Sequence, residues 1–388
     1  MRRPLLLITG LCLTVITLGF RQSVGGPPRH RATTVPGALA TGFQLVYNDT
    51  YRGWPLWPRH EQHPVRGSFL EPRGAGDNGL FGYHFGIDIS VDDDHPERGA
   101  GRIFSHRVYA VESGTALVRK RARRLICADR RLSVGHFAYW HVSPTVRPGT
   151  WIHAGAPIGW TCRGMWHLHL SEWTLRGGAR IWVNPLHAGG KLVPYVDRAA
   201  PVVEALRFFS PPTRPWHPLY SLREADTARL LDPGQLSGRV EIRAEIYDRQ
   251  SFWGWLARHP AWKTPQHPYR VAFAILSDRS GAVIPHGISY QSDSVPQTPY
   301  LVHYAPGTIK NLAMWECIEA PPGTQCGGQF WFRPLSRYRL EYWDTRRVPN
   351  ARYDVVVRAW DLKGNTAALT AVVTVANGVA DDRLRASK

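Results

Sequence analysis

Short segments with the alternating pattern of a β-strand, separated by turn residues, most constrain the fold of this chain. From Arg239 to Ile246 charged and apolar residues alternate, and successive side chains of a strand point to opposite faces. This pattern predicts a half-exposed strand. Glycine (36 residues) and proline (31) supply frequent turns, whereas long amphipathic helical patterns are scarce. The sequence therefore predicts a mainly β fold, with further strands in segments 108–118, 137–142, 167–173, 271–276, 353–360 and 367–375.

The length of 388 residues favours two domains over one. A proline-rich stretch at 211–215 breaks regular structure and marks a domain edge. We predict a first β-rich domain at 42–194, a connecting segment at 195–236, a second domain at 237–377 and a disordered tail at 378–388. Residues 353–365 resemble the closing hairpin of a bacterial immunoglobulin-like or fibronectin-like domain, which implies that the second domain is an immunoglobulin-like β-sandwich.

The N-terminus has the residue order of an export signal. Arg2 and Arg3 precede an apolar segment at 4–20, which is the order of a signal peptide. The segment is close to the shortest that spans a bilayer and no clear cleavage motif follows it, so a cleaved signal and a retained membrane anchor both remain open. Residues 21–41, rich in proline, glycine and arginine, are predicted to be a flexible linker.

Four cysteines lie beyond Cys12, and an even number suits an oxidising compartment. Cys317 and Cys326 bracket a turn-rich loop, which predicts a local disulfide. Cys127 and Cys162 are candidates for a second disulfide within the first domain. Zinc ligation by the four cysteines is the alternative, but they lack the Cys-x-x-Cys spacing that is typical of such sites.

A formal net charge of +18 favours polyanionic partners. Nucleic acid, anionic lipid headgroups and anionic cell-wall polymers all fit this charge. The chain has no recognisable nucleic-acid-binding motif, and an export signal also argues against that partner. The charge is therefore compatible with anionic wall polymers.

Two histidine motifs carry the candidate chemistry. His84 and Asp88 are four residues apart, so on a strand they share one face, with Gly86 between them leaving room for an ion. Phe85 and the apolar residues after it are then expected to face a core. His167 and His169 likewise share a face, and two histidines with one carboxylate form a known catalytic zinc set. The alternative, local hydrogen bonding by each histidine, is less favoured because both motifs occur together.

The order of these motifs resembles that of the lysostaphin-type, or LytM, zinc peptidases. The resemblance covers residues 67–186 and rests on His84-Phe85-Gly86-Ile87-Asp88, Tyr139-Trp140-His141-Val142 and His167-Leu168-His169-Leu170. It implies a β-sheet catalytic domain of the duplicated-hybrid-motif kind. It also implies that His84, Asp88 and His169 bind Zn²⁺, while His141 and His167 lie beside the metal-bound water as the catalytic pair.

Two other residues compete for catalytic roles. His136 is a rival to His141, which we favour because its neighbours match the register of the motif. Glu172 would be a general base, but its odd separation from His169 puts it on the opposite strand face.

The resemblance implies an exported zinc endopeptidase that cleaves peptide stems or cross-bridges of bacterial peptidoglycan. The alternative is a catalytically inactive wall-binding or regulatory protein that retains the fold. The presence of all five polar residues favours the enzyme.

Overall fold

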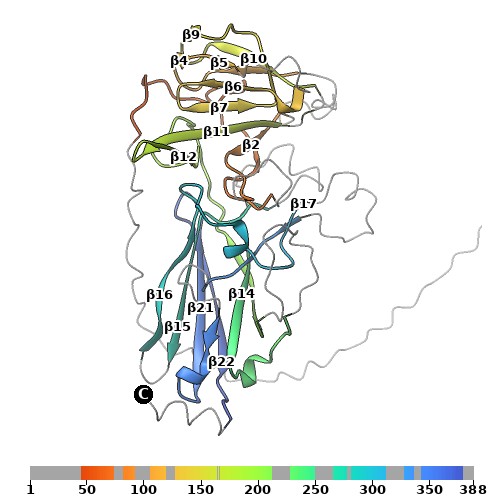
Figure 1. Ribbon diagram of the computed structural model, residues 1–388, viewed down its shortest axis with the longest axis vertical. Helices are drawn as coiled ribbons and strands as arrows, with labels where there is room; N and C mark the ends of the chain where they lie inside the picture. The colour runs from red at the N-terminus through yellow and green to blue at the C-terminus, as the bar shows by residue number, and fades with distance from the viewer. Residues whose placement is uncertain are drawn as a thin grey trace, which may run out of the picture. The chain divides into compact units, whose positions relative to one another are not determined.

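The computed structural model describes residues 45–73, 82–91, 105–118, 127–163, 165, 167–211, 228–249, 265–277, 281–311, 327–335 and 342–378. These residues form several antiparallel β-sheets, which confirms the predicted mainly β class (Figure 1). No helix within these ranges is long and apolar enough to cross a membrane. The apolar segment at 4–20, the linker at 21–41, Cys317 and Cys326 all lie outside the described residues, as does the tail from 379 onward.

The N-terminal region, residues 45–194, is built around a seven-stranded sheet. Its strand order is β1-β2-β11-β7-β6-β5, with β12 paired to β11. These strands are β1 (Val65–Gly67), β2 (Ile87–Ser90), β5 (Leu117–Val118), β6 (Arg131–Val134), β7 (Phe137–Trp140), β11 (His167–Arg176) and β12 (Ala179–Val183). The longest, β11, lies between β2 and β7 and pairs with both. Since β11 carries His167 and His169, its pairing with β2 brings this motif beside the one that contains Asp88.

Smaller sheets complete this region. One contains β3 (Arg107–Tyr109), β10 (Pro157–Thr161) and β8 (Val142–Pro144), and another pairs β4 (Gly114–Thr115) with β9 (Trp151–Ile152). A short 3-10 helix, η3 (Cys127–Asp129), precedes β6. A disulfide joins Cys127 in η3 to Cys162, directly after β10, with 5.6 Å between the two Cα atoms.

The C-terminal region, residues 195–378, contains two four-stranded sheets. The first comprises β13 (Val202–Phe209), β14 (Arg239–Tyr247), β19 (Trp331–Phe332) and β20 (Trp343–Asp344), and the second has the order β16 (Gly281–Gln291), β15 (Arg270–Ser277), β21 (Arg352–Trp360) and β22 (Thr366–Thr374). A further hairpin pairs β17 (Ile309–Asn311) with β18 (Gly327–Gln329). The 3-10 helices are η4 (Pro233–Gln235), η7 (Tyr300–Val302) and η9 (Thr345–Arg347).

The segment predicted as a connection, 195–236, contains the whole of β13. This strand pairs with β14 from Val202 opposite Tyr247 to Phe209 opposite Glu241. Most side chains of β13 are only partly buried, so apolar and polar residues do not alternate regularly along it. The sequence pattern therefore did not predict this strand. The sheet therefore begins before the predicted boundary at residue 237.

The prediction that β14 is half exposed is wrong. Glu241 and Arg243 are each only 3% exposed, although both are charged. Their side chains lie on the same strand face, and the Arg243 guanidinium donates to Glu241 at 3.0 Å. Arg333 donates to the other Glu241 oxygen, also at 3.0 Å. Mutual neutralisation allows the charged face to be buried together with the apolar one.

A fragment of residues 200–378 is expected to melt at least about 10 °C above one of residues 239–378, because removing β13 leaves the edge of β14 unpaired. Thermal unfolding followed by circular dichroism compares the two. Equal melting temperatures would show that β13 contributes nothing to the stability of the C-terminal region.

Candidate metal centre

The register between β2 and β11 places Asp88 directly opposite His169. Side chains of directly opposed residues in neighbouring strands lie on the same face of the sheet. The alternate residues Ile87, Ile89, Leu168 and Leu170 are fully buried in the hydrophobic core. Packing of these apolar side chains thus fixes which face carries the carboxylate and the imidazole.

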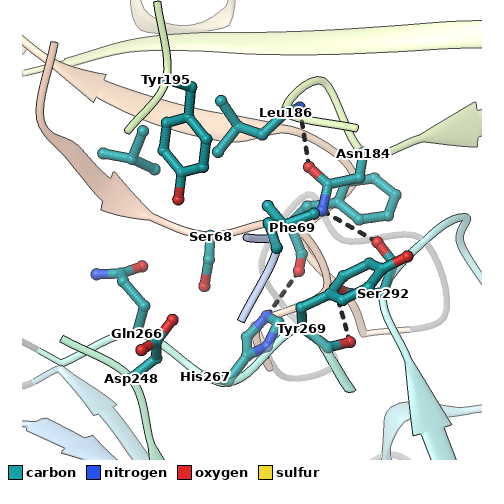
Figure 2. Close-up of a pocket in the computed structure, with 12 residues that line it drawn as sticks. Ser68, Phe69, Asn184, Leu186, Tyr195, Asp248, Gln266, His267, Tyr269 and Ser292 are labelled. Atoms are coloured by element: carbon teal, nitrogen blue, oxygen red, sulfur yellow. Dashed lines mark hydrogen bonds between the residues drawn. The ribbon is translucent and has the colours of Figure 1, made fainter. Parts of the chain in front are cut away.

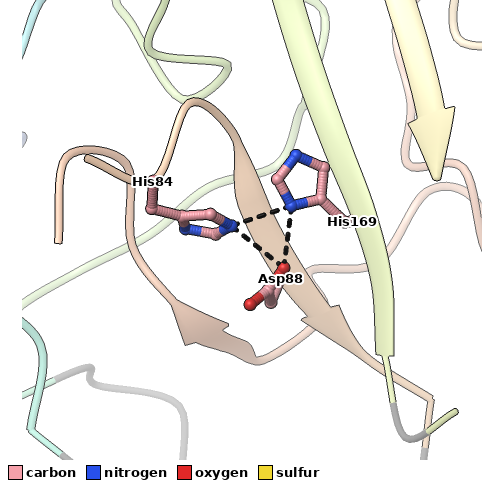
Figure 3. Close-up of side chains that lie close together, drawn as sticks. All are labelled: His84, Asp88 and His169. Atoms are coloured by element: carbon pink, nitrogen blue, oxygen red, sulfur yellow. Dashed lines mark hydrogen bonds and ion pairs between the residues drawn. The ribbon is translucent and has the colours of Figure 1, made fainter. Parts of the chain in front are cut away.

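His84 brings a third donor to this pair, from the segment that precedes β2 (Figure 3). Its Nε2 atom lies 2.8 Å from His169 Nδ1. The Oδ1 atom of Asp88 lies 3.1 Å from each of these nitrogens. All three side chains are buried, and their donor atoms converge on one point.

In each of the two imidazoles, the inner nitrogen faces Asp88 and the outer nitrogen makes a hydrogen bond elsewhere. These outer hydrogen bonds favour ligation of a metal by the inner nitrogens. The outer Nδ1 of His84 lies 2.8 Å from the Ser68 carbonyl oxygen, which can only accept, so Nδ1 carries the proton and Nε2 has a free lone pair. The outer Nε2 of His169 lies 2.7 Å from the Ser171 hydroxyl, which can accept its proton and leave Nδ1 as a second lone pair. Two such lone pairs beside a carboxylate oxygen repel one another, and a cation between them removes the repulsion.

Zinc fits this donor set. It binds imidazole nitrogen and carboxylate oxygen at about 2.0–2.2 Å, so ligand atoms in a tetrahedral site lie roughly 3.4 Å apart. The separations of 2.8 and 3.1 Å need to widen by only a few tenths of an ångström. Three protein ligands would leave one coordination position for water or substrate.

Two glycines allow the donors to approach. A Cβ atom on Gly86 would lie 2.6 Å from His169 Nε2 and 2.5 Å from the Leu170 carbonyl oxygen. A Cβ atom on Gly67 would lie 2.5 Å from Asp88 Oδ2. The space at Gly86, which was predicted to leave room for an ion, is filled by the His169 ring and the backbone of β11.

The three donors line a pocket of about 240 Å³. Its other lining residues are Arg73, Phe85, Trp140, His141, Met165 and His167. Phe85 is buried, as predicted, but it lies outside the main hydrophobic cluster and lines this pocket, because β2 begins only at Ile87 and strand alternation does not extend back to Phe85. The Phe85 ring instead packs against Trp140 and His169, with centroids 5.6 and 5.1 Å apart.

His141 and His167 lie together at the same pocket. Their ring centroids are 4.8 Å apart, and His167 Nε2 lies 3.5 Å from Asp88 Oδ1. His141 has a φ of 61°, a left-handed conformation that is uncommon for a residue with a side chain. Its carbonyl oxygen accepts from the Cys162 amide at 2.7 Å, so the Cys127–Cys162 disulfide adjoins the segment that holds it.

The competing residues His136 and Glu172 do not line this pocket. The Nδ1 atom of His136 lies 2.9 Å from Glu112, and Glu172 accepts from the Tyr47 hydroxyl at 2.6 Å. The preference for His141 over His136 therefore agrees with the geometry, as does the exclusion of Glu172.

Arg73 and Glu71 are site residues that sequence reasoning missed. The Arg73 guanidinium lies 2.5 Å from Asp88 Oδ2 and 2.6 Å from Glu71 Oε1. Both precede His84 in a segment with no periodic pattern, so no sequence signal marked them. Arg73 adds a fixed positive charge beside the Asp88 carboxylate. The motif of His84, Asp88 and His169 does not contain this charge.

Burial and this charge set the ionisation of the site. Burial, assisted by Arg73 and by His169, lowers the pKa of His84 to about 4. Burial also lowers the pKa of His167 and of His169. For Asp88, burial raises the pKa, but His167, His84 and Arg73 together outweigh it and hold the pKa well below its ordinary value. Neutral imidazoles beside an ionised carboxylate are the forms that bind zinc.

A second cluster, in which Asp197, Asp248 and Asp361 approach one another, contains only carboxylates. Burial, then the charges of the other two, raise the pKa of Asp248 to about 9. This pKa favours the protonated, neutral form of Asp248 at neutral pH.

Comparisons of this chain with protein-family models, with curated proteins and with solved structures found no match.

Gly86→Ala is expected to lower zinc affinity by at least about tenfold, because the added methyl group would displace the His169 ring. Equilibrium dialysis against a zinc buffer measures this. Gly378→Ala, where a Cβ meets nothing within 4 Å, is the control and should bind zinc normally. Unchanged affinity in Gly86→Ala would show that His169 has room to move and still bind.

The Glu112–His136 pair is expected to stabilise the fold most between about pH 4.5 and 6.5. The hydrogen bond with Glu112 raises the pKa of His136, so this contribution is lost as pH rises through the folded-state value. Burial raises the pKa of Glu112, but hydrogen bonds from His136 and Asn48 outweigh it, so stability is also lost as pH falls through the lowered value.

Glu112→Gln should therefore cost about 2 kcal/mol at pH 6 and less at pH 8.5. Urea unfolding of both proteins at the two pH values tests this. A difference that stays constant or grows with pH would contradict an ion pair at this position.

Proposed function

We propose that this chain is an exported, zinc-dependent endopeptidase that hydrolyses peptide bonds in bacterial peptidoglycan. The observation that carries the proposal is the convergence of three buried donors, His84, Asp88 and His169, beside His141 and His167 in one pocket. The rings of His84 and His169 are buried, and hydrogen bonds to Ser68 and Ser171 orient them, as is typical of histidines that bind a metal. In this proposal the N-terminal region is the peptidase core and the C-terminal region an immunoglobulin-like β-sandwich.

His84, Asp88 and His169 would hold the zinc ion. When bound, zinc supplies a Lewis acid that polarises the scissile carbonyl group and acidifies water at neutral pH. Arg73 orients the second oxygen of Asp88 through its contact at 2.5 Å. This contact leaves Oδ1 directed at the two imidazoles.

His167 and His141 carry the proton transfers. As a neutral imidazole, one of them accepts the proton of the attacking water and later gives it to the nitrogen of the leaving amine. The other, as a hydrogen-bond donor, stabilises the negative charge that develops on the carbonyl oxygen. The adjacent Phe85 and Trp140 rings give the pocket an apolar wall, and electrostatic interactions are stronger beside apolar surface than in bulk water.

The substrate class follows from the motif resemblance, and the charge and the predicted export are compatible with it. A net charge of +18 favours association with anionic wall polymers. The disulfide between Cys127 and Cys162 suits an oxidising compartment outside the cytoplasm. Residues 1–20 would direct export, and the linker at 21–41 would let the folded part reach the wall.

The test separates metal ligation from catalysis within one motif. His169→Ala should lower zinc affinity by more than about a hundredfold, because a site with three protein ligands loses one of them. His167→Ala should retain zinc but lower kcat about 10²- to 10⁴-fold, because it removes a proton-transfer group. Metal content and the release of new amino termini from purified peptidoglycan measure the two effects.

His153→Ala, which alters an exposed histidine outside the pocket, is the matched control and should change neither property. Loss of zinc in His167→Ala with retention in His169→Ala would reverse the two assignments. Cleavage by both variants would exclude a zinc peptidase. Full zinc occupancy of the wild-type protein without any cleavage would favour the inactive wall-binding protein.

A further inference from the structure

The C-terminal region contacts the segment 68–71, which is hydrogen-bonded to His84. The His267 imidazole lies 2.6 Å from the Phe69 carbonyl oxygen, an interaction visible in Figure 2. The Tyr304 hydroxyl donates to the Leu70 carbonyl oxygen at 3.0 Å. Both side chains are buried, so these hydrogen bonds form away from solvent.

The same segment holds His84 in place. The Ser68 carbonyl oxygen accepts from the outer His84 nitrogen at 2.8 Å. Two backbone hydrogen bonds add to this, because the Leu70 amide donates to the His84 carbonyl oxygen at 2.8 Å and the His84 amide donates to the Glu71 carbonyl oxygen at 2.9 Å. The position of His84 therefore depends on the backbone from Ser68 to Glu71.

Leu70 has a backbone conformation that needs external support. Its φ is 72°, a left-handed value that is costly for a residue with a bulky side chain, and this side chain is fully buried. Such a conformation persists only when the surrounding structure imposes it. The Tyr304 hydroxyl is bound to the carbonyl oxygen of this residue.

Tyr83 anchors His84 from the other side. Its ring packs edge-on against Tyr300, with centroids 6.4 Å apart, and its hydroxyl donates to the Pro299 carbonyl oxygen at 3.3 Å. Asp88 and His169, by contrast, are positioned by the register of β2 and β11 inside the N-terminal sheet. His84 is thus the ligand whose placement depends on the C-terminal region.

We infer that the C-terminal region is a working part of the metal centre, in which His267 and Tyr304 position His84 and so set the affinity for zinc. This inference rests on the proposed zinc site. His267 and Tyr304 are positioning residues, since neither lines the pocket. They act by holding the backbone of Phe69 and Leu70, which orients the carbonyl oxygen of Ser68 and the His84 ring bound to it.

The test uses two buried tyrosines, of which Tyr304 contacts Leu70 directly and Tyr290 does not. Tyr304→Phe removes the hydroxyl that binds Leu70, and Tyr290→Phe removes a buried hydroxyl that contacts Tyr304 and His267. We expect Tyr304→Phe to weaken zinc binding by about three- to tenfold, the equivalent of one hydrogen bond, and Tyr290→Phe by less than about twofold. Competition with a chromophoric chelator, on the full chain, gives both dissociation constants.

A second pair tests rescue at His267. His267→Leu removes the donor to Phe69 and should weaken zinc binding at least as much as Tyr304→Phe does. His267→Gln keeps an N–H donor and should restore part of the affinity. Visible absorption of the cobalt-substituted proteins adds a signature of ligand geometry, which a loss of stability alone does not change. Faster hydrogen exchange of the Leu70 amide in metal-free Tyr304→Phe would locate the effect in this segment.

Equal zinc affinities of the wild-type and Tyr304→Phe proteins would overturn the inference and leave the proposed function intact. Equal weakening by Tyr304→Phe and Tyr290→Phe, with unchanged hydrogen exchange of the Leu70 amide in metal-free Tyr304→Phe, would also overturn it, because the effect would then not pass through the contact with Leu70. A wild-type protein that binds no zinc would overturn the proposed function itself.

Discussion

The register between β2 and β11 is the constraint on which the candidate site depends. It sets Asp88 opposite His169 on one face and puts Leu168 and Leu170 into the core on the other. A slip of one residue would exchange the faces, exposing the leucines and burying the imidazole among apolar side chains. Core packing and ligand placement are therefore enforced by the same pairing.

Burial around this pairing gives the site its chemical character. Removal from water keeps the imidazoles neutral, and the charge of Arg73 helps to keep Asp88 ionised. These protonation states suit a divalent cation, and they follow from the environment rather than from the residue types alone. In β14 the environment likewise decides how charged residues are accommodated. Glu241 and Arg243 are buried there because Glu241 is paired with Arg243 and Arg333.

The two regions divide the positioning of the donors between them. The N-terminal sheet carries Asp88 and His169 on the paired strands β2 and β11, whereas His84 lies before β2. Its backbone is held by the segment from Ser68 to Glu71, and that segment is in turn bound by His267 and Tyr304. The C-terminal region is thus linked to the site through these hydrogen bonds.

The sequence by itself determined the mainly β class and the motif residues that converge, because strand period and residue spacing are local properties. Leu168 and Leu170 face the core as the alternation predicted, and His141 rather than His136 reaches the pocket. Only the tertiary structure decided the roles of Arg73, Phe85 and the C-terminal region. Arg73 lies 2.5 Å from Asp88, and His267 reaches Phe69 across 198 positions of sequence. Such contacts depend on how distant segments pack, and no periodic pattern encodes that packing.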